Sequence, residues 1–260
     1  MTTNGIVNGN KIKHKVTAII QVRMQSKRLP GKAMLNLCGK PILAHVIERT
    51  KLIEGVDSIV VATCTGEKNL PIIELAHSMN VDTFIGSMEN VLERYYLAVQ
   101  QFGGNHIVRI TGDNPFIDVD YASMTLSIAL ESGADLCALT NLPLGTAVEV
   151  IKRESLEEVY KMSEKPYHLE HVTTLLKEHP ELFTIERHEV DFNNPYDKLR
   201  LTVDTIEDYQ VASILYKNLY NGKPFPIIDV IHFLKQNPKV VLINNNINQR
   251  PYLHSEYGHA

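Results

Sequence analysis

The 260-residue chain lacks the features that would assign it to a membrane or secreted class. No apolar run approaches the roughly 18 residues that a membrane-spanning helix needs. The first 15 residues are polar and contain none of the apolar core of a secretory signal. The three cysteines, Cys38, Cys64 and Cys137, lie far apart and form no CxxC pair, so we expect no disulfide framework. These absences predict a cytoplasmic protein without membrane contact.

Acidic residues are missing from one end of the chain. Residues 1–47 contain no Asp or Glu but carry eight of the 26 Lys and Arg residues, whereas all 30 acidic residues follow. The formal net charge of −4 argues against a general nucleic-acid binder. We therefore expect the N-terminal part to bind an anion smaller than a nucleic acid. A basic tail kept for solubility explains only Lys11, Lys13 and Lys15, because the other cations lie inside the folded pattern.

Short apolar strands alternate with amphipathic helices through the first half of the chain. Val16 to Val22 is a β-branched apolar run typical of a buried strand, and Pro41 marks the first turn of a helix. The same alternation continues, which predicts a mostly parallel, Rossmann-like sheet with helices on both faces. The further strands expected in this half are 57–63, 81–85, 106–110 and 135–139, and the further helices are 70–79, 91–99 and 124–130.

The second half is more mixed. The expected strands are 147–151, 199–203 and a loosely alternating run at 183–190 that fits an antiparallel position, and the expected helices are 155–162, 169–178, 206–219 and 227–234. No Gly/Ser/Pro linker divides the chain, and no internal repeat is visible. The sequence therefore predicts one α/β domain at 16–240 with a small mixed β/α extension. A flexible basic tail at 1–15 and an extended Asn-rich tail at 241–260 flank it.

The loop after the first strand has the composition of a phosphate-binding loop. Ligands of open parallel sheets bind beyond the carboxyl ends of the strands, and this loop follows the first of them. Ser26 adds a hydroxyl donor, and Gly31 lets backbone approach a ligand. The loop is not a GxxxxGK[ST] motif, which argues against kinases and ATPases of that type. An exposed basic turn is the other interpretation. The four cations of the loop are Arg23, Lys27, Arg28 and Lys32.

The run IIQVRMQSKRLPGKAMLNLCGKPILAHVIER resembles the opening of the cytidylyltransferase superfamily that activates acidic sugars, which includes the enzymes that make CMP-Kdo and CMP-sialic acid. Its R-M-x-S-x-R-L-P-G-K pattern is similar to the branch named after spore coat polysaccharide biosynthesis protein F. The resemblance continues in VLERYYLA, RITGDNPFID, PYHLEHVT and LRLTVDTIEDY, and so covers roughly residues 16–234. It implies one nucleotidyltransferase domain of the glycosyltransferase-A type. Gln25 replaces a usual Gly of the branch, and Lys27 replaces a smaller polar residue.

Two aspartates that each follow an expected strand are candidates for a metal site. Asp113 lies in TGDNP and Asp204 in LTVD, so both can face the same rim of the sheet. Carboxylate oxygens suit Mg²⁺, which neutralises a triphosphate during phosphoryl transfer. The resembled family holds its metal with the Asp of a GD motif and the Asp of a VDTxED motif, which implies Asp113 and Asp204 here. Each could instead cap a turn or a helix, and Asp118, Glu207 and Asp208 are weaker candidates.

The acceptor pocket is expected in the less regular second half. The segments GTAVE and YHLEH resemble family segments near the acceptor, which implies Glu149, Glu170 and His171 as partners of sugar hydroxyls, with His171 able to take a proton. On a helix, two adjacent residues diverge by about 100°, so at most one of Glu170 and His171 is expected to point inward. A solvated helix face is the other interpretation. Arg109 needs a partner inside a buried strand and is a candidate for an acceptor carboxylate. Arg94 fits the acceptor, the nucleotide or a neighbouring Glu.

The combined pattern predicts an Mg²⁺-dependent enzyme that converts CTP and an acidic sugar into a CMP-sugar and pyrophosphate for surface polysaccharides. The resemblance implies a sialic- or legionaminic-type acceptor and a homodimer. The residues expected to bind the nucleotide are Arg23, Ser26, Arg28, Lys32, Thr111 and Asp113, and those expected to carry catalysis are Arg23, Lys32, Asp113 and Asp204. Three alternatives remain: a glycosyltransferase that uses a finished nucleotide sugar, cytidylyl transfer to a sugar phosphate or phosphonate, and a non-enzymatic nucleotide-binding scaffold.

Overall fold

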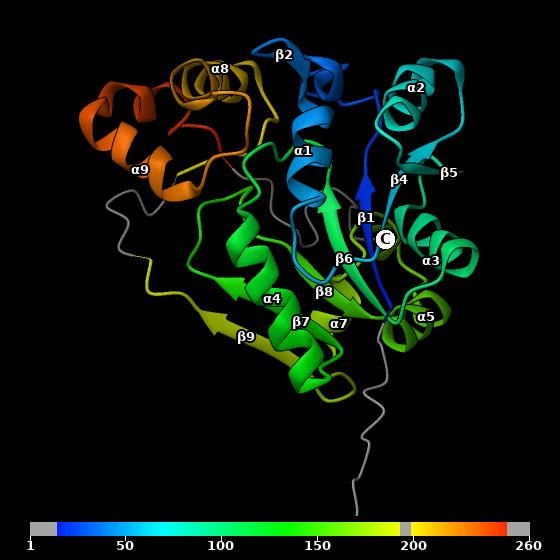
Figure 1. The fold of residues 1–260 in the computed structure, drawn as a ribbon. Coiled ribbons are helices and arrows are strands. Elements are labelled where there is room, and N and C mark those ends of the chain that lie inside the picture. Colours follow the sequence, from blue (N-terminus) through cyan, green and yellow to red (C-terminus); the bar gives the residue numbers. More distant parts are fainter. Residues whose placement is uncertain (1–14, 193–198, 249–260) are drawn as a thin grey trace, which may run out of the picture.

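One seven-stranded sheet organises the computed structural model, which describes residues 15–192 and 199–248 (Figure 1). The strand order is β5-β4-β1-β6-β8-β7-β9. Within this sheet β8 pairs antiparallel with β6 and β7, and the other neighbours pair in parallel. The prediction of one α/β domain with a mostly parallel sheet is confirmed. The strands are β1 Val16–Gln21, β4 Ser58–Cys64, β5 Asp82–Gly86, β6 His106–Thr111, β7 Leu136–Thr140, β8 Glu149–Lys152 and β9 Ile185–Glu189.

Helices cover both faces of the sheet because its apolar residues alternate between two cores. Ala18 and Ile20 of β1 lie in the core with α1, α2, α4, α8 and α9, whereas Ile19 lies in the core with α3, α5 and α7. No helix in the described part of the chain is long and apolar enough to cross a membrane. The helices are α1 Ile42–Thr50, α2 Leu70–Ser78, α3 Val91–Phe102, α4 Val119–Ser132, α5 Arg153–Met162, α6 Pro166–Glu170, α7 Thr174–Glu178, α8 Ile206–Leu219 and α9 Ile227–Gln236.

Several short elements complete the fold. Residues 241–243, assigned above to an extended tail, belong to η3, and the Asn244 side chain donates to Arg200 O at 3.1 Å. Residues 1–14 and 249–260 of the two expected tails lie outside the described residues. The domain boundary at 240 stays a prediction. The short elements are the hairpin β2 Asn36–Leu37 with β3 Lys40–Pro41 and the 3₁₀ helices η1 Lys32–Met34, η2 Glu67–Asn69 and η3 Pro238–Ile243.

The strand expected at 199–203 is wrong, since this segment makes only a single β-bridge, between Leu144 and Arg200. The chain that pairs at Leu144 turns away from this segment at the next residue, Gly145, which has a φ of 94° in the left-handed region that favours glycine. A Cβ on Gly145 would lie 2.5 Å from Thr202 N, so only glycine permits this close backbone contact. The extended segment still delivers Asp204 to the rim of the sheet, because Val203 N donates to Asp113 O at 2.9 Å.

Two further expectations in the second half need correction. The single helix expected at 169–178 is two short helices, α6 and α7, because His171 and Thr173 leave helical backbone and bury Val172 between them. The strand expected at 183–190 exists as β9, but it pairs in parallel with β7. The antiparallel strand is β8, which follows β7 after a short loop, as an antiparallel pair requires.

Candidate active site

The cationic loop, residues 23–32, follows β1 and is held in shape by hydrogen bonds. Gly31 has a φ of 72°, and its N–H donates to Met24 O at 2.9 Å, which closes the loop. Met24 N in turn donates to the buried Asn69 side chain at 3.0 Å. The Ser26 hydroxyl accepts from Leu29 N at 3.4 Å. Contacts within the chain therefore hold the loop, and its charged side chains line the pocket.

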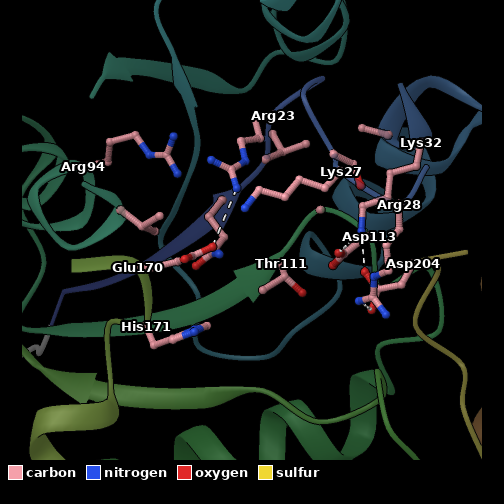
Figure 2. Close-up of a pocket in the computed structure, with 16 residues that line it drawn as sticks. Arg23, Lys27, Arg28, Lys32, Arg94, Thr111, Asp113, Glu170, His171 and Asp204 are labelled. Carbon is pink, nitrogen blue, oxygen red and sulfur yellow. Dashed lines mark hydrogen bonds and ion pairs between the residues drawn. The ribbon is translucent and has the colours of Figure 1, made fainter. Parts of the chain in front are cut away.

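A pocket of about 300 Å³ lies beyond the carboxyl ends of β1 and β6 (Figure 2). This is the rim where ligands bind in open parallel sheets. Four segments contribute to its wall: the cationic loop, the turn at Gly112 and Asp113 after β6, the end of α6 and the segment before α8. Nine residues named from the sequence line it together: Arg23, Ser26, Arg28, Lys32, Thr111, Asp113, Glu170, His171 and Asp204.

Lys32 joins the two predicted metal carboxylates at one end of this pocket. Its Nζ lies 2.5 Å from Asp113 Oδ2 and 2.7 Å from Asp204 Oδ1. Arg28 Nη2 lies 2.9 Å from the other oxygen of Asp204. Residues that are 81 and 172 positions from Lys32 in the sequence are thus brought to a single point.

The ammonium group shows that these carboxylates fit one small cation between them. In the described part of the chain no group of three or more His, Cys, Asp or Glu residues forms a metal site. Two carboxylates suit Mg²⁺, which is commonly held by one or two carboxylates together with substrate phosphates and water. Asp113 and Asp204 would hold such an ion near the position that the Lys32 ammonium occupies.

Charge attraction keeps this cluster ionised. Burial works against the charged form of Asp113, but the Lys32 ammonium attracts and hydrogen-bonds the carboxylate and lowers its pKa. Burial likewise works against the charge of Lys32, yet Asp113 and Asp204 together raise the pKa of the amine. At neutral pH Asp113 is therefore a carboxylate and Lys32 an ammonium.

Close backbone packing aims both aspartates at the pocket. A Cβ on Gly112 would lie 2.7 Å from Val22 Cβ, so the turn before Asp113 can approach β1 only with glycine. Asp204 stands directly before Thr205, the N-cap of α8, whose hydroxyl accepts from Asp208 N. The carboxylate of Asp208 accepts in return from Thr205 N at 3.0 Å, which completes a capping box, and it also accepts from Asp204 N at 3.1 Å.

The weaker metal candidates Asp118, Glu207 and Asp208 do not line the pocket, and two of them have structural partners. Asp118 caps α4 by accepting from Tyr121 N and also accepts from Ile227 N at 2.9 Å. Asp208 is buried and accepts from Arg200 Nη2 at 3.2 Å and Asn244 Nδ2 at 2.9 Å. These contacts fasten the start of α8, and with it Asp204, to the rest of the domain.

Asp208→Asn should lower the free energy of unfolding at pH 7 by about 2–4 kcal/mol, because it removes the carboxylate that lies 3.2 Å from Nη2 of the buried Arg200. Burial alone would raise the pKa of Asp208, but hydrogen bonds from Arg200 and Asn244 hold it below the usual 3.8. The stabilisation is therefore present above that value and lost as the pH falls through the folded pKa. Urea unfolding of wild type and variant at pH 7 and pH 3 measures this. A difference that does not shrink in acid, or an equal loss in Glu207→Gln, would contradict it.

Arg23, Glu170 and His171 lie at the other end of the pocket. Arg23 Nη1 donates to Met88 O at 3.2 Å, and its Nη2 lies 3.7 Å from Glu170 Oε1. The expectation that at most one of Glu170 and His171 points inward is wrong, since both line the pocket. Helix α6 ends at Glu170, and His171 has a φ of −113° and a ψ of 87°, so the helical 100° offset does not apply.

Arg109 and Glu149 pair with each other across β6 and β8 and do not line this pocket. Arg109 Nη1 lies 3.0 Å from Glu149 Oε2, which supplies the partner that a cation in a buried strand requires. Glu149 also accepts from Thr173 at 3.0 Å and from Lys177 at 2.5 Å. The pair thereby ties α7 to the sheet, and its part in acceptor binding stays a prediction.

Sequence reasoning left Arg94 and Lys27 without a committed role, although both line the pocket. Lys27 is exposed, whereas Arg94 on α3 is buried with 2% of its surface exposed. Arg94 lies three residues after Val91, which also lines the pocket, and residues three apart share a helix face. The sequence shows this spacing but does not show that this face borders the pocket.

Two relatives cover nearly the whole chain. Residues 17–247 match the family model described as Cytidylyltransferase. The chain is 36% identical over 238 residues to the Uncharacterized protein MJ1063 of Methanocaldococcus jannaschii, which covers 92% of this chain and 98% of that protein. It is 31% identical over 227 residues to the Spore coat polysaccharide biosynthesis protein SpsF of Bacillus subtilis, with coverage of 85% and 94%.

Solved structures share the fold. A cytidylyltransferase from Leptospira borgpetersenii superimposes with a TM-score of 0.82 at 28% identity, covering 92% of this chain and 100% of that chain. A CMP:2-keto-3-deoxy-manno-octonic acid synthetase complexed with CTP superimposes with a TM-score of 0.62 at 17% identity, with coverage of 79% and 100%. The predicted nucleotidyltransferase fold is confirmed. On the match over residues 17–247, the chain belongs to the cytidylyltransferase family.

Proposed function

We propose that this protein transfers the cytidylyl group of CTP to an acidic sugar and releases pyrophosphate. The observation that carries the proposal is the convergence of Lys32, Asp113 and Asp204 at 2.5 and 2.7 Å in a pocket also lined by Arg23 and Arg28. Carboxylates for a hard metal beside cations for phosphates are the parts that phosphoryl transfer uses. Family membership and the similarity to SpsF, whose name assigns it to polysaccharide biosynthesis, support the same proposal.

In the proposed reaction, a hydroxyl oxygen of the sugar bonds to the α-phosphorus of CTP while the bond from that phosphorus to the β-bridging oxygen breaks. Pyrophosphate leaves, and the hydroxyl proton passes to the ring of His171. Arg23, Arg28 and Lys32 stabilise charge on the phosphates and on the departing pyrophosphate. Bound Mg²⁺, held by Asp113 and Asp204, would neutralise part of the triphosphate charge. No protein nucleophile is required, because positioning and electrostatics supply most of the catalysis.

The proposed acceptor class is the one that the sequence resemblance implies. We propose a sialic- or legionaminic-type nine-carbon acid and a homodimeric enzyme. A sugar acid needs one group for its carboxylate and several for its hydroxyls, and Glu170 and His171 line the pocket at the end away from the metal carboxylates. Surface polysaccharides are the proposed destination of the product.

A substrate screen tests the proposal. Purified protein is incubated with CTP, UTP, ATP or GTP, with and without Mg²⁺, against a panel of acidic sugars, and pyrophosphate is measured. We expect release only where CTP, Mg²⁺ and an acidic sugar are all present. A glycosyltransferase would instead consume a CMP-sugar and release CMP without pyrophosphate. Binding of CTP with no turnover across the panel would contradict the proposed reaction.

A further inference from the structure

Arg94 is a buried cation whose charge is not matched by the residues around it. Its side chain is 2% exposed, and neither its Nε nor its Nη1 has a hydrogen-bond partner within the described residues. A buried guanidinium without a partner costs several kcal/mol of folding free energy. Such a group is retained at this cost where a ligand supplies the missing partner.

The charges that line the pocket are unequally distributed between its two ends. Figure 2 places Arg94 and Glu170 at one end and Lys32, Arg28, Asp113 and Asp204 at the other. At the second end, two cations lie within 3.0 Å of two carboxylates. At the first end, Glu170 lies 3.7 Å from Arg23, and no carboxylate of the described chain forms an ion pair with Arg94. The Arg94 end therefore carries more positive than negative charge.

A second unpaired polar group lines the same pocket. Gln21, the last residue of β1, has a buried Oε1 without a hydrogen-bond partner in the described part of the chain. An amide that lines the same pocket as a guanidinium and a carboxylate offers donors and acceptors to a ligand that has hydroxyl groups as well as a negative charge. This is the chemistry of a polyhydroxylated acid.

We propose that Arg94 receives the carboxylate of the acceptor and that Gln21 bonds one of its hydroxyl groups. The inference rests on the proposed function and assigns the acceptor to the Arg94 end of the pocket. The triphosphate needs the Lys32 end, because the metal carboxylates lie there. A carboxylate compensates the Arg94 charge fully, whereas the neutral carbonyl of a nucleotide base leaves a net charge buried. Arg94 is thus a binding residue that selects acidic over neutral sugars.

The experiment compares Arg94→Met with Arg153→Gln, a control that removes an arginine on α5 outside the pocket. Thermal unfolding is followed in pyruvate, which has the carboxylate of a 2-keto acid, against pyruvamide and sodium chloride at equal ionic strength. We expect pyruvate to raise the Tm of wild type and Arg153→Gln and to leave that of Arg94→Met unchanged. Without ligand, Arg94→Met should unfold at or above the wild-type Tm, because a buried unpaired charge is gone. Arg94→Gln, which also removes the charge, replaces it if Arg94→Met does not fold.

Kinetics with an accepted acidic sugar give the second readout. Loss of a charged hydrogen bond should raise the KM for the acceptor about 10- to 100-fold and leave the KM for CTP within about threefold. A rise in the KM for CTP with an unchanged acceptor KM would overturn the inference and assign Arg94 to the base. Equal pyruvate stabilisation of wild type and Arg94→Met, or none in either, would also overturn it. Because the pyruvate test needs no turnover, its result is independent of whether the proposed reaction occurs.

Discussion

Asp113→Asn should fold like wild type and lower metal-dependent pyrophosphate release at least about a thousandfold. The substitution keeps the shape of the side chain but removes one of the two carboxylates that converge at 2.5 and 2.7 Å on Lys32. A neutral amide is a poor Mg²⁺ ligand, and electrostatic stabilisation of transferring phosphates is worth several kcal/mol. Asp204 keeps Lys32 paired in the variant, so little stability is lost. Initial rates over a range of Mg²⁺ concentrations give the measurement.

The matched control is Asp229→Asn, which removes an exposed carboxylate in the first turn of α9. It should retain wild-type activity and metal dependence. Full activity in Asp113→Asn would remove this residue from the metal site. A loss that high Mg²⁺ concentrations restore completely would assign it to metal affinity alone.

Lys32→Met should change metal binding and turnover in opposite directions. In the free protein the ammonium occupies the space between Asp113 and Asp204, so its removal frees both carboxylates for a cation. We expect Mn²⁺, used as a probe for Mg²⁺, to bind the variant more tightly than wild type in the absence of nucleotide. Turnover should fall about a hundredfold or more, because the triphosphate loses a cation that stabilises its charge.

Calorimetric titration with Mn²⁺ at pH 7.5 and pyrophosphate release from the same preparations measure the two effects. Lys40→Met is the control, since Lys40 pairs with Glu48 outside the pocket. The pKa of Asp113 should rise in Lys32→Met, because burial still disfavours its charge and the ammonium no longer offsets this. As the pH is lowered, the variant should consequently lose its metal affinity at a higher pH than wild type does. Weaker Mn²⁺ binding in Lys32→Met would show that Lys32 is not a competitor.

Local patterns in the sequence predict those parts of the fold that local physics decides. Helix α8 begins and ends where its apolar spacing and the Thr205 cap place it, and the buried run at 16–22 contains β1. The segment at 199–203 has the same apolar character but is not a strand. Its backbone partners are Leu144 and Asp113, which no neighbouring residue reveals. Pairing between distant segments is a tertiary property that propensity does not encode.

The same distinction between local pattern and tertiary contact applies to the candidate site. The cationic loop and the two aspartates were predicted because each follows an apolar run at a sheet rim, and the structure brings them together. Arg109 was the more prominent buried arginine in the sequence, but cross-strand register pairs it with Glu149. Arg94 lines the pocket instead, and neither its Nε nor its Nη1 has a hydrogen-bond partner within the described residues. The burial of a helix residue depends on the neighbours that pack over it. Which buried charge is compensated is a property of the assembled fold.

The long sequence separation inside the Lys32 cluster has a kinetic consequence. The Lys32–Asp204 contact closes a loop of 172 residues, and the Lys32–Asp113 contact closes one of 81. Contacts between distant residues form late, because the entropy of closing the chain must be overcome before they contribute. During synthesis the cationic loop and β1 therefore exist long before a metal site does. If the proposed metal site is right, tight divalent-cation binding would report that the chain has folded as far as the start of α8.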